Sequence, residues 1–138
     1  MRFVTIIAAL LAGSIAHAAD KPCTPAQSSA AQKALDKVNS WDQLHKAWVD
    51  YGHCDANAVG EAYTDALLRL AIDWKNVPAF AGTVQKDAKY KEFIFAHLQS
   101  PAAKDDLPSL YSRAKKDCPS GLDAFCAEIA DVTKPAPK

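Results

Sequence analysis

His53, Cys54, Asp55 and Glu61 place an imidazole, a thiol and two carboxylates within nine positions of the chain. These side chains bind transition metals, and a thiol activated by an imidazole is a common catalytic nucleophile. The spacing matches neither use, because the sequence lacks the H-E-x-x-H zinc pattern, the four-cysteine zinc pattern and the G-x-S-x-G nucleophile turn. We therefore predict no catalytic residue, no metal site and no cofactor.

The first 18 residues indicate where the protein is located. Arg2 gives a short basic start, residues 3–15 form an apolar run, and residues 16–18 (Ala-His-Ala) provide a small-x-small cleavage signal. The run is shorter than the roughly 20 residues that a membrane-spanning helix needs. We predict a cleaved signal peptide at residues 1–18 and a mature protein in the periplasm or outside the cell, without membrane insertion.

The four cysteines are an even number, which predicts two disulfides in an oxidising compartment. Cys23 lies just before the first expected helix and Cys54 just after the second, so an antiparallel helix pair brings both to the same end. Cys118 and Cys126 flank a short turn between two later helices, where the separation suits a disulfide. The predicted pairs are Cys23–Cys54 and Cys118–Cys126, and this pairing removes Cys54 as a metal ligand.

Apolar residues recur with helical rather than strand periodicity along most of the chain. Residues 24–27 (Thr-Pro-Ala-Gln) and 40–43 (Ser-Trp-Asp-Gln) have the composition of capping boxes at the start of two helices. Gly52 is a natural stop for the second helix, and Asp55 or Asn57 is the expected cap of the third. These patterns predict an all-α fold, a compact bundle of five to seven short helices with two disulfides.

The domain organisation follows from length and from the absence of repeats or long linkers. Cleavage after Ala18 leaves 120 residues, which is the size of one compact domain. We predict a single helical domain over residues 19–131 and a disordered tail over residues 132–138.

The third expected helix, over residues 57–74, has the strongest pattern. One face is apolar, with Val59, Tyr63, Ala66, Leu67, Leu70 and Trp74 at helical spacing. The opposite face is charged, with Glu61, Asp65, Arg69 and Asp73. Leu68 and Ile72 fall beside Glu61 and Asp65, on the side expected to face water. Either this helix is central and covered on most sides, or this face contacts a partner.

Charge narrows the class of partner. Without Arg2 the mature chain has 15 basic and 16 acidic residues, which argues against a nucleic-acid binder. The charges are unevenly spread: residues 36–73 hold seven acids and three bases, whereas residues 75–116 hold eight bases and four acids. Such asymmetry can steer a charged protein partner.

Cys54-Asp55 and the run 58–66 (Ala-Val-Gly-Glu-Ala-Tyr-Thr-Asp-Ala) resemble the characteristic helix of the Tai-type immunity proteins. Those are small secreted helical proteins with disulfides that neutralise type VI secretion amidases in the periplasm. The chain is equally similar to an uncharacterised family of proteobacterial secreted helical proteins. The Tai resemblance covers under half of the chain, and residues 118–126 depart from that pattern. It implies a homodimer without catalytic activity, which inserts a helix or loop into a toxin's active cleft, and contacts near Gly60, Glu61, Tyr63 and Asp65.

The function predicted from these features is a periplasmic protein-binding module, an inhibitor or immunity protein that occludes the active cleft of a partner such as a secreted effector enzyme. The candidate partner-binding residues are Gly60, Glu61, Asp65, Leu68 and Ile72. One alternative is a small-molecule or lipid carrier with a cavity lined by Trp41, Trp48, Tyr63, Leu67 and Phe93. Another is an enzyme that uses His53 with Glu61 or Asp65.

Overall fold

The computed structural model describes residues 21–136. The predicted signal peptide lies outside the described residues, as do residues 137 and 138. The described part contains α-helices and two short 3-10 helices and no strand, which confirms the all-α prediction. The elements in chain order are α1 (Pro25–Leu35), α2 (Trp41–Tyr51), η1 (Gly52–Cys54), α3 (Asn57–Asp73), α4 (Val77–Lys86), α5 (Ala88–Leu98), η2 (Pro101–Ala103), α6 (Leu107–Lys116) and α7 (Asp123–Val132).

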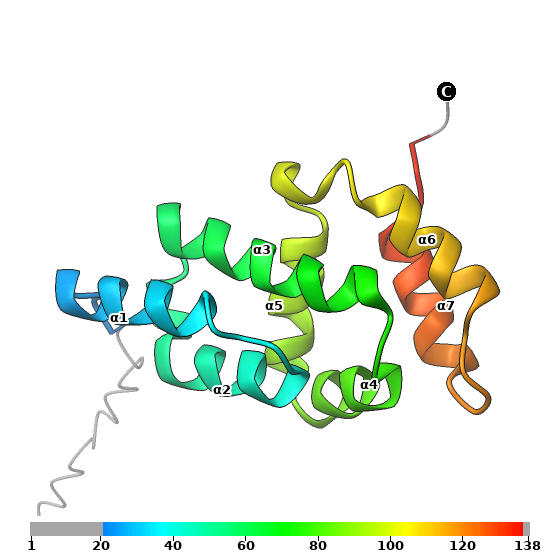
Figure 1. Ribbon diagram of the computed structural model, residues 1–138, viewed down its shortest axis with the longest axis horizontal. Helices are drawn as coiled ribbons and strands as arrows, with labels where there is room; N and C mark the ends of the chain where they lie inside the picture. Colours follow the sequence, from blue (N-terminus) through cyan, green and yellow to red (C-terminus); the bar gives the residue numbers. More distant parts are fainter. Residues whose placement is uncertain (1–20, 137–138) are drawn as a thin grey trace, which may run out of the picture.

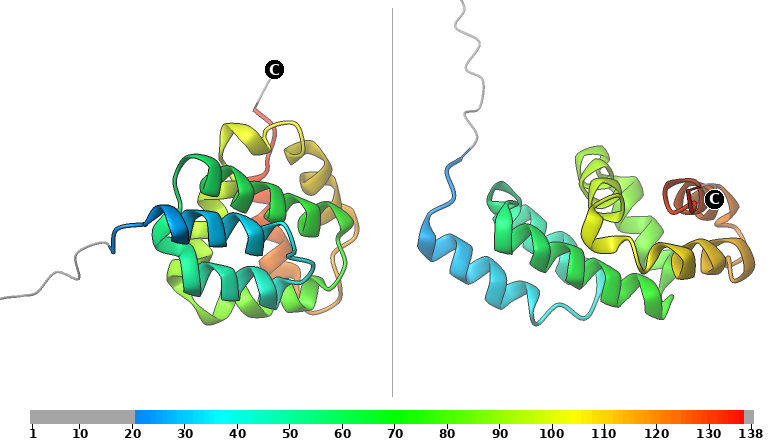
Figure 2. Two further views of the ribbon diagram at one scale, coloured as in Figure 1. Left: turned by 60° about the vertical axis from the view of Figure 1, so that its left-hand side comes forward. Right: turned by 90° about the horizontal axis from the view of Figure 1, so that it is seen from above.

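The helices form an elongated bundle (Figures 1 and 2). At one end α1 packs against both α2 and α3, and α5 crosses behind α3 to reach α4. At the opposite end α6 and α7 form a hairpin that packs mainly on itself and reaches α3 through α6. None of the described helices is long and apolar enough to cross a membrane.

Helix α3 is the central element of the bundle. It packs against α1, α2, α5, α6 and η2, so side chains on most of its circumference are covered. Leu68, which periodicity placed among the acidic residues, is only 7 % exposed. The structure therefore supports the first of the two alternatives for this helix, a central helix covered on most sides.

The predicted capping boxes differ in detail. At α1 the box is complete: Thr24 Oγ1 accepts a hydrogen bond from the Gln27 backbone N–H, and the Gln27 side chain accepts one from the Thr24 N–H. At α2 the Ser40 hydroxyl accepts from the Gln43 N–H, but the Gln43 side chain accepts from Asn39 instead of Ser40. In both cases local side chains satisfy N–H groups that a helix start leaves without a partner.

Gly52 does not stop α2 in the way the sequence suggested. Its φ of −57° is right-handed, and the chain continues directly into η1. A Cβ at this position would lie 2.9 Å from Trp48 Cδ1, which is closer than real Cβ atoms approach. Glycine is required here because the Trp48 indole packs onto the backbone, and not because of a left-handed turn.

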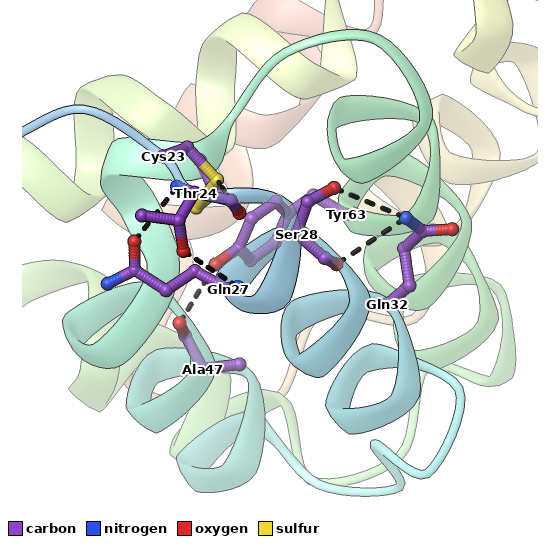
Figure 3. Close-up of a disulfide and its surroundings, with 8 residues drawn as sticks. Cys23, Thr24, Gln27, Ser28, Gln32, Ala47 and Tyr63 are labelled. Atoms are coloured by element: carbon purple, nitrogen blue, oxygen red, sulfur yellow. Dashed lines mark hydrogen bonds between the residues drawn. A yellow bond between two sulfur atoms is a disulfide. The ribbon is translucent and has the colours of Figure 1, made fainter.

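Both predicted disulfides are present. Cys23 pairs with Cys54 at a Cα–Cα distance of 4.9 Å, and Cys118 pairs with Cys126 at 6.0 Å. Figure 3 shows the first of them beside the α1 capping box, with Tyr63 of α3 nearby. The bond joins the start of α1 to η1, because the α1–α2 hairpin brings these two points to one end of the bundle.

Aromatic rings pack directly against one another in the interior. Trp41 stacks on Phe80 with ring centroids 3.7 Å apart, and Tyr63 meets Phe93 edge to face at 4.9 Å. The Tyr63 hydroxyl donates to the Ala47 carbonyl at 2.8 Å (Figure 3). Residues that the carrier hypothesis placed around a cavity therefore fill the core with each other.

The C-terminal boundary lies further along than predicted. Helix α7 continues to Val132, and the Thr133 side chain is buried and donates to the Ile129 carbonyl at 2.6 Å. Val132 and Thr133 thus belong to the folded domain. The hydrogen bond to the last turn of α7 satisfies the Thr133 hydroxyl, as a buried polar group requires.

Candidate functional site

A hollow of about 340 Å³ lies between the first half of α3, the end of α5 and η2; we refer to it as the α3–η2 hollow. Its lining residues are Gly60, Glu61, Thr64, His97, Ser100, Pro101 and Ala102. Two of the predicted partner-binding residues, Gly60 and Glu61, are therefore part of its wall.

The local sequence explains why η2 returns over α3. Pro101 follows Ser100 directly, and a residue before proline is disfavoured in helical conformation, so α5 ends at Leu98. Proline then starts η2, where its missing N–H has no cost. Ala103 at the end of η2 is fully buried and holds this segment against the bundle.

His97 lies at the base of the hollow and is only 8 % exposed. Its Nε2 is 3.1 Å from Asp55 Oδ2, and its Nδ1 is 2.7 Å from Thr64 Oγ1. An ionised carboxylate can only accept, so Nε2 carries a proton and donates to Asp55. In the neutral ring Nδ1 is then an acceptor, and the Thr64 hydroxyl donates to it.

The same contacts also accommodate a protonated His97. Nδ1 then donates to Thr64 Oγ1, and the Thr64 hydroxyl turns to the Gly60 carbonyl, which is 3.2 Å away. Both ring nitrogens of His97 and the Thr64 hydroxyl are paired in both protonation states, as buried polar groups require. The network connects the junction between η1 and α3 to the last turn of α5.

Asp55 and Asn57 do not cap α3 as predicted. The N-cap is Ala56, with no side-chain cap hydrogen bond, and Asn57 has a positive φ of 49°. Asp55 instead directs its carboxylate to His97. Asp55 therefore makes a long-range hydrogen bond to α5 in place of a local cap on α3.

Sequence reasoning missed Thr64 and His97 because no motif links them. They are separated by 33 positions, and His97 lies 42 positions from Asp55. The available signal was a histidine among the apolar positions of α5, since a buried imidazole must find partners elsewhere in the fold. A carboxylate, an imidazole and a hydroxyl form one hydrogen-bonded series, as in the catalytic triads of hydrolases, but here the carboxylate binds Nε2 and the hydroxyl binds Nδ1, which is the reverse of the triad arrangement.

Ser100 is the one lining residue with a buried side-chain oxygen that has no partner among the described residues. Its Oγ is buried and makes no hydrogen bond to any of the described residues. A buried hydroxyl without a partner is costly and calls for an explanation, such as a ligand or water that supplies one. Neighbouring atoms cover this Oγ, so it does not face the hollow that other atoms of Ser100 line.

The acidic residues of α3 differ in how far they are neutralised. Asp65 is exposed and pairs with Arg69 one turn later, while Arg69 also donates to the Leu35 carbonyl at 3.0 Å. Glu61 is exposed and forms no ion pair within residues 21–136. Glu61 therefore carries the free negative charge at the rim of the hollow.

The other residues predicted to bind a partner or to act in catalysis do not form a site. Leu68 belongs to the core and is not available to a partner, because α3 is covered on that side; Ile72 is half-buried. His53 is half-buried in η1 and makes no hydrogen bond to Glu61 or Asp65, and its Nε2 has no partner among the described residues. Over the same residues, no group of three or more His, Cys, Asp or Glu side chains could hold a metal ion.

Comparison with known proteins produced no match: no protein-family model, no curated protein and no solved structure matches the chain. The likeness to the Tai-type immunity proteins therefore stays a prediction. Function has to be inferred from the geometry and charge of the α3–η2 hollow.

Proposed function

We propose that this chain is a protein-binding module of the periplasm or the extracellular space, which acts as an inhibitor or immunity protein by covering the active cleft of a partner such as a secreted effector enzyme. The observation that carries the proposal is the exposed Glu61, which lies at the rim of the α3–η2 hollow and has no ion partner among the described residues. A charge that lacks a partner among the described residues suits a contact with an oppositely charged group of another molecule.

The scaffold around the hollow favours binding. A disulfide ends one residue before Asp55, and Asp55 in turn holds His97 at the base of the hollow. Side chains held in place before association lose less conformational entropy on binding, which raises affinity.

The compartment is supported by covalent structure. Both disulfides are formed and no described cysteine is free, which is typical of proteins from oxidising environments. The apolar run at residues 3–15 is the corresponding export signal in this proposal. A homodimer, which the Tai resemblance implies, belongs to the same proposal and is tested by the sedimentation mass of the purified protein.

The test is a pull-down from periplasmic extract with the wild-type protein, Glu61→Lys and the control Asp131→Lys, which reverses an exposed charge on α7. We expect a partner to be retained by the wild type and Asp131→Lys and lost by Glu61→Lys, with unchanged helical circular dichroism in all three. Equal recovery by Glu61→Lys rejects this surface as the binding site.

The Asp55–His97–Thr64 geometry favours a second candidate function, hydrolysis of a small ester. Thr64 Oγ1 would bond to the carbonyl carbon while its proton moves to His97 Nδ1, and that proton would then leave with the alcohol as the ester C–O bond breaks. Water would hydrolyse the acyl-threonine in the second step. Hydrolysis of p-nitrophenyl acetate should then disappear in Thr64→Ala and persist in Thr64→Ser; equal rates for wild type and Thr64→Ala exclude it.

A further inference from the structure

We propose that the α6–α7 hairpin opens from the rest of the bundle as one unit, and that residues 74–76, the α3–α4 corner, form a strained clasp that sets how easily it opens. The hairpin consists of α6, the disulfide-bonded turn that follows it, and α7, over residues 107–132. This movement is independent of the surface around Glu61 and goes beyond the proposed function.

The backbone of the α3–α4 corner is unfavourable. Trp74 has φ 51° and ψ 21°, and Asn76 has φ 52° and ψ 38°, so two of three consecutive residues are left-handed. Asparagine tolerates this region, whereas a bulky tryptophan adopts it only at a cost in free energy. A residue in such a conformation persists only where surrounding contacts hold it. The corner therefore stores strain, most of it at Trp74.

Two tryptophan side chains supply contacts that hold the corner. The Trp41 Nε1–H donates to the Lys75 carbonyl at 3.4 Å, and this bond lies within the bundle. The Trp74 Nε1–H donates at 2.9 Å to the carbonyl of Asp117, the residue that directly follows α6. The second bond exists only while the hairpin is docked. Undocking breaks it and allows Trp74 to leave the left-handed region, so the released strain lowers the free energy that opening costs.

The hairpin has the connections of a unit that can move. Its two helices are joined covalently through Cys118 and Cys126 and pack mainly on each other. Within the described residues a single stretch of chain, residues 104–106, connects it to the bundle. One side-chain link to α5 is the partly exposed ion pair between Lys91 and Glu128, and such pairs contribute little in water. Figure 2 shows the hairpin at one end of the elongated molecule.

An aromatic contact opposes the strain and keeps the hairpin closed. Phe125 of α7 meets Phe80 of α4 edge to face, with ring centroids 5.0 Å apart, and both rings are buried. Opening separates them and uncovers aromatic surface, which contributes strongly to the binding of apolar groups. The closed form is therefore the stable one, and the open form presents a surface that the closed form hides.

Native-state hydrogen exchange of the purified, disulfide-bonded protein labelled with ¹⁵N tests this movement at denaturant concentrations below the unfolding transition. We expect the helical amides of α6 and α7 to exchange through one common opening, about tenfold or more faster than the most protected amides of α3. Trp74→Phe removes the indole donor and should speed exchange in the hairpin about fivefold.

Tyr63→Phe is the matched control, because it removes a hydrogen bond to Ala47 that stays intact when the hairpin opens. It should speed exchange in α3 and leave the amides of α6 and α7 unchanged. The strain is tested by comparing Trp74→Asn with Trp74→Ala. Both lack the indole, but asparagine tolerates the left-handed conformation, so the hairpin should exchange about threefold more slowly in Trp74→Asn.

Faster exchange in the hairpin that follows this pattern supports the clasp. Any of four results overturns it: exchange of α6 and α7 only at the rate of α3, hairpin exchange unchanged in Trp74→Phe, hairpin exchange that Tyr63→Phe speeds as much as that of α3, or equal rates in Trp74→Asn and Trp74→Ala.

Discussion

The two disulfides stabilise regions that have very different relations to the candidate site. Cys23–Cys54 joins residues 31 positions apart and holds η1, which leads directly into Asp55, the carboxylate that binds His97. Cys118–Cys126 joins residues eight positions apart and holds only the turn between α6 and α7. The first bond therefore joins the start of α1 to the segment that leads into the α3–η2 hollow. The second stabilises a hairpin that packs mainly on itself.

Long-range bonds hold the residues around the hollow, whereas the hairpin combines local bonds with a few to other elements, such as the hydrogen bond from Trp74 Nε1 to the Asp117 carbonyl. Around the hollow the stabilising contacts link different elements, as in the bond between Thr64 of α3 and His97 of α5. In the hairpin, the ion pair between Arg113 and Asp117 spans a single helical turn. Substitutions in the two regions should therefore differ in size and in reach.

The largest expected effect is the loss of the first disulfide. In the chain-entropy model the Cys23→Ala/Cys54→Ala variant loses about 4 kcal/mol of unfolding free energy, and Cys118→Ala/Cys126→Ala about 2.5 kcal/mol, because the first bond closes the longer loop. Urea unfolding followed by circular dichroism measures both. Equal losses of unfolding free energy in the two variants would contradict the comparison. So would a change in the NMR signals of the His97 ring that occurs only in Cys118→Ala/Cys126→Ala.

The next effect concerns carboxylates in the two regions. Asp55→Ala leaves the His97 Nε2 proton without its acceptor and should cost about 2 kcal/mol. Asp117→Ala removes an exposed pair with Arg113 and should cost less than about 1 kcal/mol. Thermal unfolding of both variants tests this ranking, and a larger loss in Asp117→Ala would show that the hairpin stabilises the fold more than the hollow does.

Glycine substitutions should separate packing from backbone strain. Gly52→Ala places a methyl group against the Trp48 ring and should cost about 1–3 kcal/mol with a change in tryptophan fluorescence. Gly121, in the turn of the hairpin, has open space around it but a φ of +83°, so Gly121→Ala should cost about 1 kcal/mol without a fluorescence change. Gly121→Asn should recover part of that loss, because asparagine tolerates the left-handed region; failure to do so would refute the strain explanation.

The smallest effect distinguishes two buried tyrosines of the core, Tyr63 and Tyr90. The Tyr63 hydroxyl donates to Ala47, whereas the buried Tyr90 hydroxyl has no partner in the described chain. Tyr63→Phe should cost about 1 kcal/mol, and Tyr90→Phe should be neutral or stabilising. Chemical unfolding at neutral pH gives both values, and a larger cost for Tyr90→Phe would disprove the absence of a partner.

The same tyrosines predict a loss of stability in alkali. Burial raises the pKa of Tyr63 and of Tyr90 above the ordinary value near 10, because the interior disfavours the phenolate. The unfolded chain therefore releases these protons first, so stability is complete below about pH 10 and declines as pH rises further. The Tyr63→Phe/Tyr90→Phe variant should lose less stability between pH 9 and about pH 11 than the wild type.

Local features of the fold were predictable from the sequence. The caps at Thr24 and Ser40 depend on residues a few positions apart, and the structure contains both. The disulfide pairing was also predictable, because two consecutive antiparallel helices bring the start of the first helix close to the end of the second. The all-α class followed from the helical spacing of the apolar residues along the chain.

The candidate site was predicted only in part. Gly60 and Glu61 were identified on α3, and they line the hollow. Leu68 was assigned to the same surface, but the helices packed around α3 bury it, and a periodic pattern does not reveal how many neighbours a helix has.

What the sequence by itself determined is the all-α class, the caps of α1 and α2 and the two disulfides, since each follows from residues of one helix or of two consecutive helices. What only the tertiary structure decided is the use of Asp55, Thr64 and His97. Each has a plausible local role in its own segment, as a cap, a helix hydroxyl or a charge at a helix end. Packing of α5 across α3 brings them within hydrogen-bonding distance, and burial then favours that network over the local alternatives because a buried polar group left unpaired is costly.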